Sequence, residues 1–204
     1  MPETLPMFPL GLVAFPGSVV PLRLFEPRYL AMYQELVEGS GEFGIVLIER
    51  GVAESGGGTH FGQGCVVRMM GSTPYEDGSI VLVAVGVERL EVLEWLPEDP
   101  YPAAVIERLP HAIDDADTAA AVDDARAGFR RLLALASEMG AEVADVDPDL
   151  SENPVAALYE MARMAPLQEI DQQRILEEDS ATKAAVILKD EIDGVTELLE
   201  LGLE

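Results

Sequence analysis

Apolar residues punctuated by proline dominate the first 30 positions. Two extended segments are predicted, Met7–Val13 and Val19–Phe25. Between them, Pro16-Gly17 favours a type II turn, because proline fixes its own φ and glycine accepts a positive one. Pro9 and Pro21 lack an amide hydrogen, so neither segment is expected to be a central strand paired on both sides.

Further apolar runs, bounded by turn residues, predict that the first part of the chain is rich in β-structure. Val87–Trp95 alternates between apolar and polar residues, with an interruption that indicates a bulge or a twist. Asp77-Gly78 marks a hairpin turn, and Glu54–His60 reads as a flexible loop. The elements predicted here are a helix over about Pro27–Glu38, ended by Gly39, and strands at Phe43–Glu49, Cys65–Gly71, Ser79–Val85, Val87–Trp95 and Tyr101–Leu109. Six or seven short strands with one early helix predict a twisted, barrel-like sheet.

Beyond residue 110 the apolar spacing changes to that of helices. Asn153 and Ser180 are typical N-cap residues, and Asp171 is expected to cap a short helix. The predicted helices are Thr118–Met139, ended by Gly140, then Pro154–Ala165, Asp171–Leu176 and Ser180–Leu201. The sequence therefore predicts an α+β protein, with a β-rich domain over residues 1–112 followed by an α-helical bundle over residues 113–204.

Charge narrows the classes of partner. The chain has 204 residues, and 38 acidic against 13 basic side chains give a net charge of −25. Such a field repels phosphate backbones and anionic lipids, so neither nucleic acid nor a membrane is an expected partner. The single Cys65 excludes an internal disulfide. No secretory signal and no membrane-spanning run is visible, so we expect a soluble, cytoplasmic protein.

The order of the first elements resembles the opening of the Lon N-terminal domain, the substrate-binding domain of ATP-dependent Lon proteases. The matching features are the Phe8-Pro9-Leu10 strand, the Phe15-Pro16-Gly17 turn, the Leu22–Phe25 strand and the Glu26–Tyr29 helix start. The later block resembles the same domain through Val155–Ala165, Pro166-Leu167, Ile170–Glu177 and Ala181–Leu201. The likeness runs from about Leu5 to Leu199 and is least typical over Ile113–Ser151.

This resemblance implies a PUA-like pseudo-barrel followed by helices, occurring as a free-standing copy of the domain. It also implies recognition of unfolded or hydrophobic polypeptide segments, in protein quality control or regulation, with a protease or a chaperone as a further partner. The oligomeric state stays open.

No catalytic residue is predicted. The sequence contains no Gly-Lys pair, so a phosphate-binding loop of the usual kind is missing. The protease part of the Lon family uses a Ser–Lys pair in a separate domain. Ser180 and Lys183 have the Ser-x-x-Lys spacing of penicillin-binding enzymes without their partner motifs. We interpret Ser180 as a helix N-cap; the alternative is a cryptic hydrolase that uses Ser180 and Lys183 or the acidic loop at Asp145–Asp149.

No metal site or cofactor is predicted either. His60 and His111 are isolated and, with one cysteine, cannot form a standard zinc site; His60 is interpreted as a solvated loop residue. Asp145–Asp149 has alternate aspartates but lacks the glycine and glutamate that a calcium loop needs. It is interpreted as an acidic inter-helix loop, with a weak surface cation site as the alternative.

The remaining indication of a binding surface is a set of flexible or amphipathic side chains. They could bury a partner's apolar groups in a shallow groove, with strand addition to a sheet edge as a further mode. The candidate polypeptide-binding residues are Phe8, Leu10, Phe15, Met69, Met70, Tyr75 and Trp95. RNA binding is a weaker alternative, based on the PUA-like fold and opposed by the negative charge.

Overall fold

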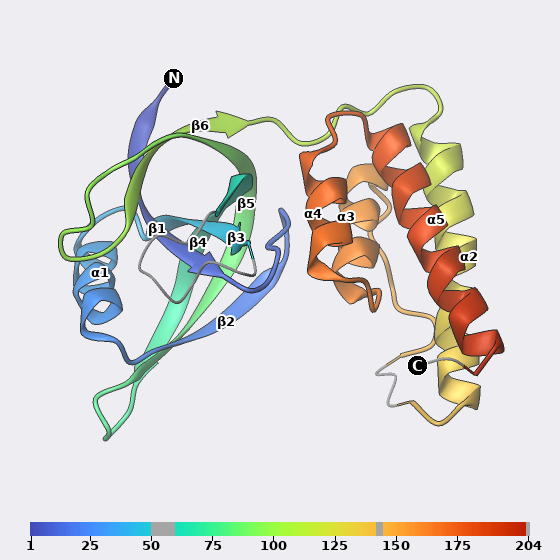
Figure 1. Ribbon diagram of the computed structural model, residues 1–204, viewed down its shortest axis with the longest axis horizontal. Coiled ribbons are helices and arrows are strands. Elements are labelled where there is room, and N and C mark those ends of the chain that lie inside the picture. The colour runs from blue at the N-terminus through green and yellow to red at the C-terminus, as the bar shows by residue number, and fades with distance from the viewer. Residues whose placement is uncertain (50–59, 142–144, 203–204) are drawn as a thin grey trace. The chain divides into compact units, whose positions relative to one another are not determined.

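The computed structural model describes residues 1–49, 60–141 and 145–202, so most of the predicted Glu54–His60 loop lies outside the described residues. The chain divides into two compact units, Met1–His111 and Ala112–Glu204. We call them the strand unit and the helical unit (Figure 1). In the described residues, a mixed sheet with one early helix, followed by four further helices, makes the protein α+β, as predicted.

The sheet of the strand unit closes on itself. Its strands are β1 (Glu3–Leu10), β2 (Val19–Leu24), β3 (Glu42–Ile48), β4 (His60–Pro74), β5 (Ile80–Trp95) and β6 (Ala103–Leu109). Their order is β2-β5-β4-β3-β1-β6, and an additional β5–β6 pairing joins the ends. Five strands therefore form a ring, and β2 lies outside it, paired with β5.

The length of β5 makes this closure possible. The two strands expected at Ser79–Val85 and Val87–Trp95 are one continuous strand of 16 residues. Its first half pairs with β2 and its second half with β6, while β4 follows its other edge. A register shift between Val92 and Glu94 confirms the predicted bulge, and a bulge bends the strand that carries it.

The predicted turn at Pro16-Gly17 is confirmed. Ser18 N donates to the carbonyl oxygen of Phe15 at 3.0 Å, and Gly17 has a φ of +80°. Gly86 of β5 faces this turn, accepting a hydrogen bond from Gly17 N and donating one to Ser18 O, both at 2.9 Å. The turn thus aligns β2 with β5.

The prolines lie where a missing amide hydrogen removes no ladder bond. β2, which carries Pro21, is an edge strand. β1 pairs with β6 through residues 3–6 and with β3 through residues 7–10, so Pro9 has a partner strand on one side only. β1 is shifted relative to the predicted Met7–Val13: it starts at Glu3 and ends at Leu10.

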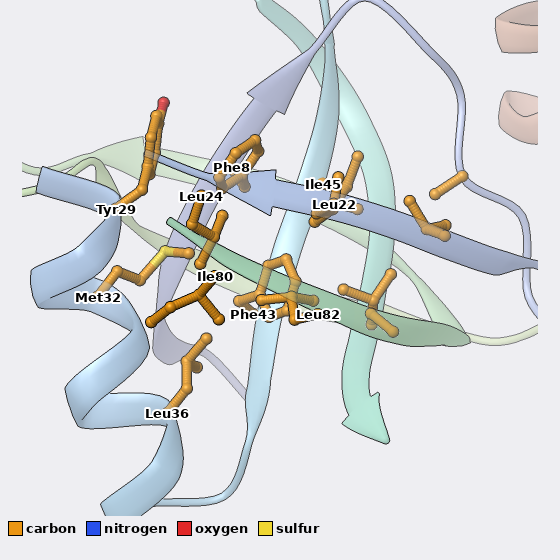
Figure 2. Close-up of a cluster of buried hydrophobic side chains, with 14 of the residues drawn as sticks. Phe8, Leu22, Leu24, Tyr29, Met32, Leu36, Phe43, Ile45, Ile80 and Leu82 are labelled. Atoms are coloured by element: carbon orange, nitrogen blue, oxygen red, sulfur yellow. The ribbon is translucent and has the colours of Figure 1, made fainter. Parts of the chain in front are cut away.

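Neighbouring residues of the ring strands are buried on opposite faces, which produces two cores. One cluster draws on all five ring strands: Leu5, Met7, Val46, Val66, Leu90, Ala104 and Ile106. The other lies between the sheet and helix α1 (Pro27–Glu38). In Figure 2, Tyr29, Met32 and Leu36 of α1 point toward Phe8, Phe43 and Ile80 of the strands.

The helical unit contains α2 (Thr118–Glu138), α3 (Pro154–Met164), α4 (Glu169–Glu177) and α5 (Ala181–Glu200), of which α2 and α5 pack side by side (Figure 1). Two predicted caps are confirmed: Asn153 Oδ1 accepts from Ala156 N at 2.9 Å, and Ser180 Oγ accepts from Lys183 N at 3.3 Å. The cap predicted at Asp171 is wrong, because α4 begins earlier and Asp171 lies in its first turn. Within the described residues, no helix has the length and apolarity needed to cross a membrane.

Candidate functional site

A half-open cavity of about 400 Å³ lies at the tip of the β4–β5 hairpin. The end of β2, the start of α1 and the hairpin turn supply its walls. It is lined by Arg23, Phe25, Leu30, Asp77, Gly78 and Ser79, and we call it the hairpin groove. The groove is therefore built from three segments that are distant in the sequence.

The alternation along β2 explains why Arg23 and Phe25 face the groove. Val20, Leu22 and Leu24 are buried in the core beneath α1. Successive side chains of a strand point to opposite faces, so the odd-numbered residues face outward. Phe25, directly after the strand, is 68% exposed. A large aromatic ring is thereby held at the surface by the packing of its neighbours.

The hairpin turn forms the opposite wall. Tyr75 N donates to Ser79 O at 2.8 Å, and Gly78 N donates to Tyr75 O at 3.0 Å. Gly78 has a φ of +82°, which a residue with a side chain rarely adopts. Asp77 Oδ1 accepts from Ser79 N at 2.9 Å and from Ser79 Oγ at 2.6 Å. The turn thus holds the Asp77 carboxylate in a fixed orientation.

Arg23 connects the two walls. Its Nη2 lies 2.7 Å from Asp77 Oδ2, and its Nε donates to Ser79 Oγ at 3.2 Å. The hydrogen bonds from Ser79, and then the charge and hydrogen bond of Arg23, lower the pKa of Asp77, so this carboxylate is ionised at neutral pH. The Arg23 guanidinium also lies 6.0 Å from the centre of the Tyr75 ring. The groove therefore combines a polar pair with aromatic rims.

Exposed apolar side chains continue from the groove along the sheet. Tyr75 is 54% exposed and Met70 is 65% exposed. Val19 is exposed on β2, and Val83 of β5 is exposed opposite Pro21. Small patches of this kind are surfaces on which a partner's apolar groups can be buried.

The structure separates the seven candidate residues named from the sequence. Phe8 and Phe15 are buried, and Leu10 and Met69 are partly buried against the same core as Phe8. Met70 and Tyr75 are exposed, and only Tyr75 lies beside the groove through its contact with Arg23. Trp95 packs against the ring interior. The seven residues do not form one surface.

His60 is not the solvated loop residue that the sequence suggested. It is the first residue of β4, and its ring lies 4.7 Å from that of Trp95. Burial lowers the pKa of His60. The glycine-rich sequence before His60 favoured a loop that included it, whereas β4 already begins at His60.

The other candidate chemistry of the sequence has structural explanations. The Ser180 hydroxyl accepts from a backbone amide at the start of α5, which is the predicted role of a cap. In the acidic loop, Asp145 Oδ1 accepts from Asp147 N at 3.0 Å, and Asp147 pairs with Arg130 at 2.6 Å. Across the described ranges, no three His, Cys, Asp or Glu side chains are arranged to hold a metal ion.

The chain belongs to the family of the ATP-dependent protease La (LON) substrate-binding domain, whose model matches residues 4–192. This confirms the resemblance that the sequence motifs indicated. A Lon protease of Anaeromyxobacter dehalogenans is 28% identical over 150 residues, which is 72% of this chain and 18% of that relative.

Two solved structures share the fold. The N-terminal domain of the Mycobacterium avium complex Lon protease matches with a TM-score of 0.67 at 17% identity, over 94% of this chain and 98% of that one. A Lon N-terminal domain protein from Xanthomonas campestris matches with a TM-score of 0.62 at 22% identity, over 91% and 96% of the two chains. By contrast, the chain spans only 18% and 26% of the length of two Lon protease relatives that it matches.

Proposed function

We propose that the strand unit binds exposed apolar segments of other polypeptides at the hairpin groove, without carrying out catalysis. The observation that carries this proposal is the 68% exposed Phe25 at a groove that also contains an ion pair, in a chain of the substrate-binding family. Any degradation of the bound polypeptide would be the work of another protein, a protease or chaperone of the cytoplasm.

The energetics fit broad and weak recognition. Burial of a partner's aliphatic side chain against Phe25, Leu30 and Tyr75 contributes roughly 0.8 kcal/mol for each methylene group. Arg23 and Asp77 already neutralise each other, so the groove does not demand a particular charge at its centre. Affinity should therefore depend on apolar side chains more than on one specific sequence.

Loss of the two aromatic rims should weaken binding. The double variant Phe25→Ser and Tyr75→Ser is expected to raise the Kd for a test peptide at least tenfold, because exposed aromatic anchors dominate interface energies. A suitable probe is a fluorescein-labelled 12-residue peptide of alternating valine and threonine with lysine at both ends, measured by fluorescence anisotropy.

Two exposed apolar residues of the helical unit, Ile170 and Leu198, offer a matched control. The double variant Ile170→Ser and Leu198→Ser should leave the Kd within about twofold of the wild-type value. Equal losses of affinity in both double variants would place binding elsewhere and contradict the proposal.

Charge should select among apolar peptides. Residues 1–110 carry 15 acidic and 6 basic side chains, a net charge of −9. Exchanging the terminal lysines of the probe for glutamates is expected to weaken binding about tenfold at 50 mM salt, and much less at 500 mM salt, where charges are screened. The two peptides share their apolar residues, so equal affinities at low salt would show that the acidic surface has no part in recognition.

A further inference from the structure

β2 is an open edge of the sheet. In the part of the chain that the structure describes, it pairs with β5 and with no other strand. The pairing runs from Val19 opposite Val85 to Leu24 opposite Ile80. An edge strand presents its unpaired N–H and C=O groups to any extended chain that can lie beside it.

The register identifies which groups these are. Gly86 N donates to Ser18 O, so Ser18 and Gly86 form a hydrogen-bonded pair in which Gly17 N, instead of Ser18 N, donates to Gly86 O. Such pairs alternate along an antiparallel ladder, so the even-numbered residues of β2 bond to β5 and the odd-numbered ones face the open edge. The open edge therefore carries the N–H groups of Val19 and Arg23 and the carbonyl groups of Val19, Pro21 and Arg23. Pro21 leaves a gap in the middle of the row of donors.

The free part of β1 lacks such a row. Met7 N donates to Pro102 O at 2.8 Å, so the odd-numbered residues of β1 direct their N–H groups away from β3. The next position of this kind is Pro9, which has no N–H. β2 is therefore the better template, because its open edge has one donor on each side of Pro21, Val19 N–H and Arg23 N–H.

We propose that an extended segment of the bound polypeptide adds to β2 as a further strand, from Val19 to Arg23, and continues into the hairpin groove at Phe25. This inference rests on the proposed function and specifies how the partner binds. The occupant is an extended polypeptide without acidic residues, because the strand unit is itself acidic and the main-chain groups of the edge recognise no particular side chain. The groove at the end of β2 then accepts one apolar side chain.

Pro21 limits this pairing. It removes the central donor, which keeps affinity low and protects the edge from permanent association with other strands. The variant Pro21→Val restores the donor without touching the bonds to β5, because position 21 faces outward. It is expected to bind the 12-residue probe about three- to tenfold more tightly, the range for one added hydrogen bond. Self-association of this variant at micromolar concentration would also support strand addition at the β2 edge.

The opposite change is Val19→Pro, which removes an outward N–H and leaves the β5 ladder intact. It should weaken probe binding about three- to tenfold, whereas Val19→Thr, which keeps the N–H and the branched side chain, should bind like the wild type. Thermal unfolding of all three variants, followed by the fluorescence of Trp95, verifies that the strand unit is folded.

N-methylation of the probe tests the ladder directly. Two methylated probes are compared, one methylated at its odd-numbered residues and one at its even-numbered residues. Methylation should weaken binding at least tenfold for one probe and less than about twofold for the other, because only one set of amides faces β2. Strand addition is overturned if the wild type binds the probe, but the two methylated probes bind equally well and Pro21→Val binds no more tightly than the wild type. Groove binding survives that result. If the wild type binds no probe at all, the proposed function itself has failed.

Discussion

Replacement of Gly86 by alanine is expected to lower the free energy of unfolding of the strand unit by about 3 kcal/mol. A Cβ atom at this position would lie 2.0 Å from the carbonyl oxygen of Phe15 and 2.9 Å from its carbonyl carbon. The turn cannot retreat easily, because Gly17 N and Ser18 O both hydrogen-bond to Gly86. The strain would separate β2 from β5 and disturb both the open edge and the groove.

Urea unfolding provides the measurement, since Trp95 is the only tryptophan of the chain and lies in the strand unit. Gly71→Ala is the matched control: Gly71 is also a strand glycine, but a Cβ atom there meets nothing within 4 Å. The control should change the stability by less than about 0.5 kcal/mol. Equal stability of the two variants would show that the contact between Gly86 and the Phe15 turn does not constrain the fold.

Local chemistry could be predicted from the sequence. The Pro16-Gly17 turn, the Asn153 and Ser180 caps and the bulge in Val87–Trp95 all depend on residues close together in the chain, and all are confirmed. The Asp171 cap failed because Gln168 ends the preceding extended stretch and Glu169 already belongs to the helix. The Asp171 side chain has the chemistry of a cap, but that chemistry alone does not show at which residue the helix begins.

Closure of the ring could not be predicted in this way. It depends on the pairing of β5 with β6 and of β1 with both β3 and β6, which joins residues far apart in sequence. The same closure explains why Phe8, a candidate polypeptide-binding residue in the sequence, is buried. Met7 faces the ring interior and Phe8 faces α1, so β1 has no fully solvated face there.

Phe25 is the exposed aromatic residue of the groove, and sequence reasoning missed it although the strand pattern contained the signal. Val20, Leu22 and Leu24 alternate in one phase, and Phe25 falls in the opposite phase. An aromatic residue that is out of phase with a buried strand is expected at the surface. Arg23 shares this phase, but its pairing with Asp77 depends on the distant hairpin and has no counterpart in the local pattern.

Glu42→Gln is expected to destabilise the strand unit by about 1.5–3 kcal/mol at pH 7, the range for hydrogen bonds to charged groups. The Glu42 side chain is 10% exposed and lies 2.7 Å from Arg68 Nη2 and 2.6 Å from Arg108 Nη2. Arg108 also pairs with Glu3 and lies 3.8 Å from Glu88. This ion network draws one residue from each strand of the ring, and Glu42 is its central acceptor.

The loss should depend on pH. Burial alone would raise the pKa of Glu42, but the hydrogen bonds from Arg108 and Arg68 outweigh it and lower the pKa. A carboxyl whose pKa is lower in the folded state stabilises the protein above its unfolded pKa of about 4.3 and ceases to do so as the pH falls through the folded value. The stability difference between wild type and Glu42→Gln, from urea unfolding monitored at Trp95, is therefore expected to be full at pH 7 and to shrink below about pH 4.

Glu91→Gln, at an exposed position of β5, is the matched control and should differ from the wild type by less than about 0.5 kcal/mol at either pH. A Glu42→Gln loss that stays constant down to pH 2 would mean that side-chain packing, rather than the charge of Glu42, stabilises this end of the ring.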